Sequence, residues 1–183
     1  MSSAVKELES KVEAARAAAK KLSRLSTEVK NKALLRIAEN LAARRDEILA
    51  ENQRDLAAAD EANMSAAMKD RLLLNTSRIA GIATDVKTVA ALADPVGEIF
   101  DMRTLPNGLQ IGRKRVPLGV IATIYESRPN VTVDISTLSL KSGNAVILRG
   151  GKEAIHSNLA LANVVQKSAY EAGVPEGAIQ IIE

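Results

Sequence analysis

The chain has 183 residues, of which 46% are apolar and 26% charged, and its formal net charge is +3. These values are typical of a globular domain with a substantial core, and no apolar run approaches the roughly 20 residues that a membrane-spanning helix needs. Two Tyr, one Phe and no Trp, with basic and acidic residues interleaved, argue against a nucleic-acid partner. The N-terminus lacks an apolar signal segment, so we expect a cytoplasmic protein.

Cysteine is absent. The described sequence therefore offers no disulfide, no thiolate metal ligand and no thiol nucleophile. His156 is the single histidine, a residue more typical of a surface or helix-cap position when it has no second histidine to complete a metal site. We expect no metal.

Apolar residues recur at three- and four-residue steps through residues 1–94, which predicts a region of amphipathic helices. One stripe runs from Val5 to Leu22, and a second runs from Val29 to Ile48 as one continuous segment. A third stripe, from Ile79 to Leu92, follows the cap signal Asn75-Thr76-Ser77. Each stripe must be buried against another element.

Near Pro95 the composition shifts toward glycine, proline and β-branched residues. The stretch "IFDMRTLPNGLQIGRKRVP" predicts two antiparallel strands joined around Asn107-Gly108, a strong short hairpin signal. Residues 95–118 are therefore predicted to form a hairpin arm.

Residues 119–183 alternate short apolar strands with helices. The strands are "GVIATIY", "NAVILR" and "AIQII", and the intervening helices stop at Gly143 and, from about Ser157 to Ala172, before Gly173. This pattern predicts an α/β fold with a parallel βαβαβ sheet covered on both faces. The sequence ends directly after the third strand, so we expect further residues or another chain to complete the sheet.

Polar residues follow the first strand, namely Glu126, Ser127, Arg128, Pro129 and Asn130. Open parallel sheets bind ligands at the carboxyl ends of their strands, and a helix N-terminus favours an anion. Arg128 offers a planar fork of donors for a carboxylate or phosphate, and Asn130 can donate or cap the helix. The alternative is that Arg128 pairs with Glu126 and Asn130 only caps.

The second strand ends in Arg149, Gly150, Gly151, Lys152 and Glu153. Paired glycines allow backbone to approach a ligand, two cations suit a phosphate, and Glu153 could accept from ribose hydroxyls. Neither a P-loop nor the G-x-G-x-x-G fingerprint is present. A plain Gly-Gly turn with solvated charges is the alternative.

The stretch "VPLGVIATIYESRPNVTVDISTLSLKSGNAVILRGGKEAIHSN", from Val116 to Asn158, resembles the γ-glutamyl phosphate reductase (glutamate-5-semialdehyde dehydrogenase) family of the aldehyde dehydrogenase superfamily. "RLLLN" and "ALADPVGEI" extend the likeness over essentially the whole chain. The resemblance implies an aldehyde dehydrogenase-like fold, with residues 1–94 as the helical part of the cofactor domain and 119–183 as the first part of an NADPH-binding domain. It also implies NADPH-dependent reduction of L-glutamyl 5-phosphate to glutamate 5-semialdehyde in proline biosynthesis.

The same resemblance assigns roles to residues. Arg149 and Glu153 fall where superfamily members meet the adenosine ribose, and Arg149 with Lys152 would suit the 2′-phosphate of NADP. Ser127 and Arg128 fall near the nicotinamide half and the oxyanion site. The predicted cofactor-binding residues are Ser127, Arg149, Gly150, Gly151, Lys152 and Glu153, and the predicted substrate or oxyanion residues are Arg128 and Asn130.

The family mechanism uses a cysteine thiolate that attacks the acyl phosphate and holds a thioester, and this chain has no cysteine. We therefore expect the N-terminal part of such a reductase, without its catalytic domain and inactive alone. The family further implies a homo-oligomer joined through the arm and an association with glutamate kinase. Two alternatives stay open: the reductase half of a pyrroline-5-carboxylate synthase, which Met1 followed directly by a helix signal disfavours, and a non-catalytic binding or assembly module.

Overall fold

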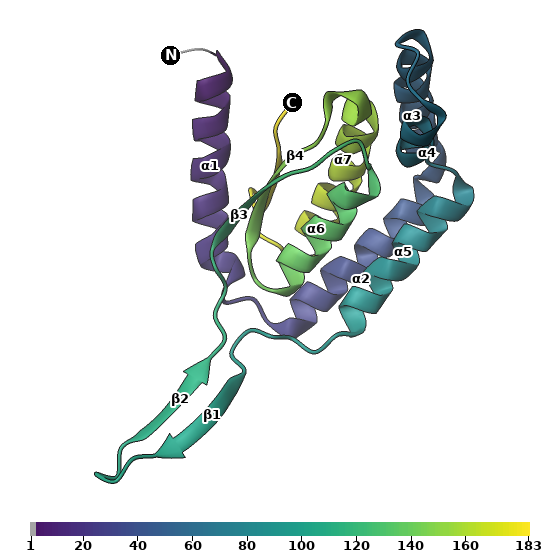
Figure 1. Cartoon of the computed structure of the whole chain (residues 1–183). Helices are drawn as coiled ribbons and strands as arrows, with labels where there is room; N and C mark the ends of the chain where they lie inside the picture. The colour runs from purple at the N-terminus through teal and green to yellow at the C-terminus, as the bar shows by residue number, and fades with distance from the viewer. Residues whose placement is uncertain (1–2) are drawn as a thin grey trace.

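The computed structural model describes residues 3–183, which form seven α-helices, five strands and one 3₁₀ turn (Figure 1). The helices of the N-terminal region are α1 (Ser3–Leu22), α2 (Thr27–Ala43), α3 (Arg45–Glu61), α4 (Ala66–Leu72) and α5 (Thr76–Ala91). The elements that follow are β1 (Ile99–Thr104), β2 (Gln110–Lys114), β3 (Val120–Ile124), α6 (Asn130–Lys141), β4 (Ala145–Arg149), the 3₁₀ turn (Lys152–Ala154), α7 (Ile155–Glu171) and β5 (Ile179–Ile181).

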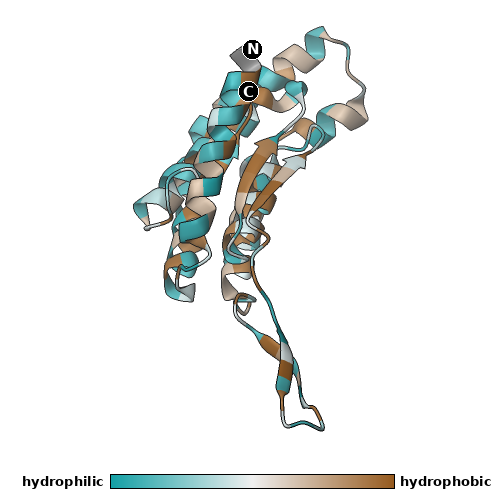
Figure 2. Ribbon diagram, turned by 90° about the vertical axis from the view of Figure 1, so that its left-hand side faces the viewer, coloured by the Kyte–Doolittle hydropathy of each residue, from teal (hydrophilic) through white to brown (hydrophobic). Residues whose placement is uncertain are grey.

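Strands β3, β4 and β5 form a parallel three-stranded sheet with β4 in the centre. Residues 145–148 of β4 are fully buried because α1 packs on one face of the sheet while α6 and α7 cover the other (Figure 1). Figure 2 shows that the strands are largely apolar, as a sheet between two helical layers requires. The predicted βαβαβ unit is confirmed.

Helices α2 and α5 pack against each other and against α7 and α6, so they add an outer layer to the covered side of the sheet. One continuous core runs from Leu34 and Ile79 in these outer helices, through Val133 and Leu161, to Ile179 in the sheet. The helical region and the sheet therefore share a core, and the apolar stripes predicted from the sequence are the faces that build it.

The expectation of one continuous helix from Val29 to Ile48 is wrong. Arg44 leaves helical geometry, with φ −101° and ψ 21°, and separates α2 from α3. Asp46 and Glu47 lie in the first turn of α3, where carboxylates stabilise the positive end of a new helix dipole. The apolar period continues across this break because both helices face the same core, which is why the stripe conceals it.

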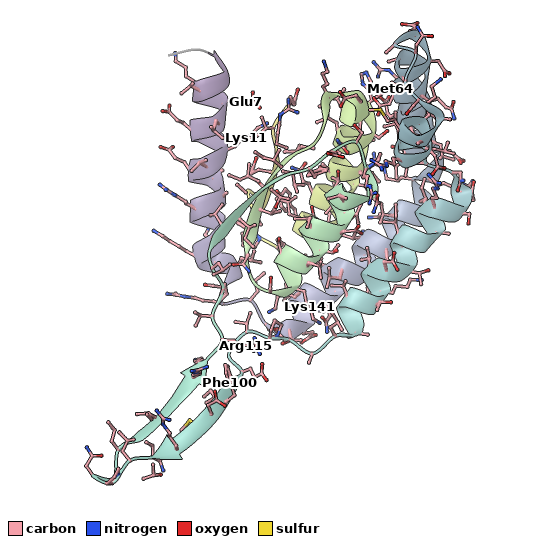
Figure 3. All side chains as sticks on the ribbon, in the orientation of Figure 1. Glu7, Lys11, Met64, Phe100, Arg115 and Lys141 are labelled. Carbon is pink, nitrogen blue, oxygen red and sulfur yellow. The ribbon has the colours of Figure 1, made fainter. Side chains whose placement is uncertain are left out.

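Strands β1 and β2 pair antiparallel as an arm that projects away from the body of the molecule (Figures 1 and 2). The arm turns at Gly108, whose φ is +84°, and the Gly108 N–H donates to the Leu105 carbonyl over 2.9 Å. The hairpin prediction is confirmed, although the turn starts at Pro106, which cannot adopt the positive φ of a two-residue type I′ turn. Figure 3 shows Phe100 and Arg115 where the arm meets the body, and the Arg115 guanidinium stacks on the Phe100 ring, 5.1 Å from its centre.

The chain entering the arm is fixed by the Asp94 carboxylate. Asp94 pairs with the buried Lys30 ammonium and accepts hydrogen bonds from Thr27 Oγ1 (2.7 Å) and the Val96 N–H (3.0 Å). Burial by itself would raise the pKa of Asp94, but these hydrogen bonds outweigh burial and lower it.

Across residues 3–183, no helix has both the length and the apolar character needed to cross a membrane.

Candidate functional site

The candidate site lies at the carboxyl ends of β3 and β4. Ile124 and Arg149 are partners at the end of the ladder, and the Tyr125 N–H extends the pairing by donating to the Arg149 carbonyl over 3.1 Å. Beyond this point the two chains separate into loops. Ser127 Oγ reconnects them by donating to Glu153 Oε2 over 3.1 Å.

A groove of about 460 Å³ opens at this point, and we call it the strand-end groove. Its walls include Tyr125, Ser127, Arg128, Gly151 and Glu153, together with Arg71 from α4. The structure therefore brings four of the predicted residues from two separate loops into one groove, as the parallel topology requires.

Two glycines allow these loops to approach each other. A Cβ at Gly151 would lie 2.8 Å from Glu153 Oε2 and 3.1 Å from Ser127 Oγ. A Cβ at Gly150 would lie 2.2 Å from Asn158 Nδ2 and 3.2 Å from Tyr125 Cε2. The Gly-Gly pair is therefore more than a turn, because the space that side chains would fill is occupied by groups of the site itself.

A buried polar network supports the groove from behind. The Tyr125 hydroxyl is 2.7 Å from Thr132 Oγ1, which donates to Asn158 Oδ1 over 3.0 Å. Burial raises the pKa of the Tyr125 phenol, partly offset by the Thr132 hydrogen bond. Asn158 is fully buried and its Nδ2 has no hydrogen-bond partner within the described part of the chain. The sequence analysis missed Thr132 and Asn158, whose only signal is a polar residue on an otherwise apolar helix face.

Arg128 does not pair with Glu126, so that alternative is wrong. The Arg128 N–H donates to the Glu126 carbonyl over 2.7 Å, but its exposed guanidinium makes no hydrogen bond or ion pair within residues 3–183. The Glu126 carboxylate instead lies 4.0 Å from the Arg71 guanidinium, with both side chains largely exposed.

Asn130 does not cap α6, which corrects the second part of that alternative. Pro129 occupies the cap position with helical φ −57° and ψ −33°, so Asn130 is already the first helical residue. Its Nδ2 donates to Asp134 Oδ2 over 2.9 Å. A proline at a helix start sets the next residue into the helix because its own φ is preset.

The remaining predicted residues lie outside the walls of the strand-end groove. Arg149 is half-buried and its Nη1 donates to the Gly150 carbonyl over 2.7 Å. Lys152 is exposed at the start of the 3₁₀ turn that leads into α7. Both cations follow the central strand, at the edge of the groove.

Helix α7 is positioned by a side chain that the sequence analysis did not select. Asp55, in α3 and 2% exposed, accepts from the His156 N–H (3.1 Å), the Ser157 N–H (2.8 Å) and Ser157 Oγ (2.5 Å). The α7 N-cap residue, Ala154, has no side chain that could cap, so Asp55 supplies the cap from another helix. The loop holding Gly151 and Glu153 is thereby fixed at both ends.

A second groove of about 380 Å³, which we call the adjoining groove, lies between α5 and the start of α6. Arg71 and Arg128 line both grooves, and the other walls include Arg78, Gly81, Asp85 and Asn130. The two grooves are therefore continuous at the pair of arginines.

A three-layered α/β unit with a groove at its strand ends, and without a glycine-rich phosphate fingerprint, defines a class of nucleotide-binding dehydrogenase folds. The chain belongs to the aldehyde dehydrogenase family, whose model matches residues 1–183. A nicotinamide cofactor is implied by this family. An 18% identical probable aldehyde dehydrogenase from Listeria monocytogenes shares the fold, with a TM-score of 0.74 over 98% of this chain and 37% of that chain.

The individual relatives are narrower in kind. The chain is 57% identical over 183 residues to a γ-glutamyl phosphate reductase of Dehalococcoides mccartyi, covering 100% of this chain and 43% of the relative. Crystal structures of γ-glutamyl phosphate reductases give TM-scores of 0.93 for Thermotoga maritima (44% identity, 97% of this chain and 43% of that chain) and 0.91 for Saccharomyces cerevisiae (36% identity, 100% and 46%). The resemblance predicted from the sequence is confirmed, and the chain spans 43% of the length of that curated relative.

Proposed function

We propose that this chain is the N-terminal part of a γ-glutamyl phosphate reductase, which reduces L-glutamyl 5-phosphate with NADPH to glutamate 5-semialdehyde and phosphate in proline biosynthesis. The observation that carries the proposal is the 57% identity to such a reductase along all 183 residues. The reaction is expected in the cytoplasm, on a small-molecule substrate and without a nucleic-acid partner.

The residues at the strand ends fit a dinucleotide. The space beside Gly151 is closed to a side chain by Ser127 and Glu153, so a ligand there would approach backbone. Glu153 would accept hydrogen bonds from ribose hydroxyls, and the cations Arg149 and Lys152 would favour a nucleotide with an additional phosphate, which is NADP rather than NAD. The bound nicotinamide would supply the hydride.

The other residues of this chain would bind and orient the acyl phosphate. The guanidinium of Arg128 has no protein partner in the described region and precedes the N-terminus of α6, where the helix dipole favours negative charge. Arg128 and Asn130 would thus stabilise the charge that develops on the carbonyl oxygen or the departing phosphate. The nucleophile would come from the rest of the enzyme, because this chain has no cysteine.

The arm would join subunits of a homo-oligomer. It carries exposed apolar side chains, of which Ile99, Met102 and Leu109 are each more than half exposed, and a free strand edge on either side. Association with glutamate kinase would supply the unstable acyl phosphate directly.

The cofactor assignment is tested in the intact enzyme with Arg149→Ala and Lys152→Ala. Each should raise the KM for NADPH more than the KM for NADH, because only NADPH carries the additional phosphate. Lys167→Ala, an exposed cation on α7, is the matched control and should change neither value. An unchanged NADPH preference in both variants would refute the assignment.

A further inference from the structure

The adjoining groove carries charges of both signs, and the described protein does not neutralise all of them. Arg78 is committed, since it donates to the Leu73 carbonyl over 2.8 Å and to Asp70 Oδ1 over 2.7 Å. Arg128 has no partner, and Arg71 has only the solvated Glu126 at 4.0 Å. Two arginines at the junction of the grooves therefore have free donors for an anion.

The opposite wall of the adjoining groove is acidic. Asp85 is exposed on α5 and forms no ion pair or hydrogen bond within residues 3–183. It faces Asp134, which is tied to the groove residue Asn130. Burial raises the pKa of Asp134 and the nearby Asp85 charge raises it further, so a cation placed between the two carboxylates would relieve their repulsion.

A ligand that satisfies both walls must carry a carboxylate and an ammonium close together, as an α-amino acid does. L-glutamyl 5-phosphate has this pair at one end and the reactive acyl phosphate at the other. We propose that the adjoining groove binds the amino-acid end of the substrate, with Asp85 receiving the α-ammonium and Arg71, beside Arg128, receiving the α-carboxylate. This inference rests on the proposed function and adds the residues that would select the substrate.

The groove has room for such a group. Gly81 lies in its wall, and a Cβ built there meets no atom within 4 Å. The reacting end of the ligand would remain in the strand-end groove beside Ser127 and Glu153, because Arg71 and Arg128 line both grooves. The substrate would thus bridge the two grooves across the arginine pair.

The test measures the oxidation of aldehydes by the intact enzyme with NADP and phosphate. Three substrates are compared: glutamate 5-semialdehyde, 5-oxopentanoate, which lacks the amino group, and 4-aminobutanal, which lacks the carboxylate. Asp85→Asn should raise the KM of the two amino-bearing aldehydes by about tenfold or more, as for a hydrogen bond to a charged group, and leave that of 5-oxopentanoate unchanged. Arg71→Gln should affect the two carboxylates and leave 4-aminobutanal unchanged.

Glu39→Gln, an exposed carboxylate on α2 outside both grooves, is the control and should change no KM. Equal effects of Asp85→Asn on all three aldehydes, or no effect on any, would overturn the inference while leaving the reductase function intact. A wild-type enzyme that oxidises none of them would instead overturn the proposed function, and the inference with it.

Discussion

Ser127 and Glu153, 26 residues apart, are joined by a 3.1 Å hydrogen bond from Ser127 Oγ to Glu153 Oε2 across the ends of two parallel strands. The bond fixes the Glu153 carboxylate at the mouth of the strand-end groove. Gly151 lies directly beneath it, because a Cβ there would touch both partners. The geometry of the candidate site therefore depends on the glycines as much as on the charged residues.

Alanine at the two glycines should produce different defects. Gly150→Ala should lower the free energy of unfolding by about 1–3 kcal/mol, since its Cβ would overlap Asn158, which is fully buried and cannot move. Gly151→Ala should have little effect on stability but should weaken NADPH binding in the intact enzyme, since the flexible Glu153 side chain would shift and lose Ser127.

Urea denaturation and NADPH titration of both variants separate these effects. Gly81→Ala, in the middle of α5 with open space around its Cβ, is the control and should stabilise the protein by about 1 kcal/mol. Equal loss of stability at positions 150 and 151 would contradict the described packing.

Asp55→Ala should be strongly destabilising. The buried carboxylate accepts three hydrogen bonds at the start of α7, and its removal would leave two N–H groups and one hydroxyl without a partner, at a cost of about 2–4 kcal/mol. Asp60→Ala on the same helix removes only an exposed pair with Lys69 and should cost less than about 1 kcal/mol. Denaturant midpoints of the two variants give the comparison, and similar midpoints would refute the capping role of Asp55.

Asp94→Asn should change how stability depends on pH. The folded structure lowers the pKa of Asp94, so the unfolded chain takes up a proton before the folded one as pH falls. Asp94 therefore contributes stability above its ordinary value of 3.8, and that contribution is lost as pH falls through the lower folded value.

Relative to the variant, the wild type should be more stable at pH 7, and the difference should shrink below pH 4. Asp46→Asn is an exposed control on α3. A difference that grows toward acid would reverse the assigned sign. Urea denaturation across the acid range measures it.

Both tyrosines should resist ionisation in the folded protein. Burial raises the pKa of Tyr125 and of Tyr170 above 10.0, and the chain has two Tyr and no Trp, so absorbance at the tyrosinate band reports these groups alone. The folded protein should show little tyrosinate at pH 10, whereas the urea-unfolded chain should be about half ionised.

Because the neutral phenols are favoured in the folded state, stability should be retained up to pH 10 and should fall as pH rises toward the folded pKa values. Tyr125→Phe should remove part of this alkaline loss. Coincident titration curves for folded and unfolded protein would contradict the burial of both rings.

Much of the architecture was predictable because it follows from local patterns. The alternation of apolar strands with helices, the Asn75 cap, the Asn107-Gly108 hairpin and the stop at Gly143 all act within a few residues, and the structure confirms them. The polar clusters at two strand ends were also predicted to converge, since parallel strands end at one edge. The break at Arg44 was not visible, because helices on either side of it present the same face to the core.

The sequence by itself determined the order of the elements, the parallel sheet and the family likeness, because periodicity and contiguous motifs are properties of neighbouring residues. Only the tertiary structure decided which side chains meet. Asp55 caps a helix that begins a hundred residues later, Thr132 and Asn158 support Tyr125, and Arg71 joins Arg128 between two grooves. Contacts of this kind depend on how layers pack, and the packing free energy comes from the whole core, so no local sequence pattern encodes them.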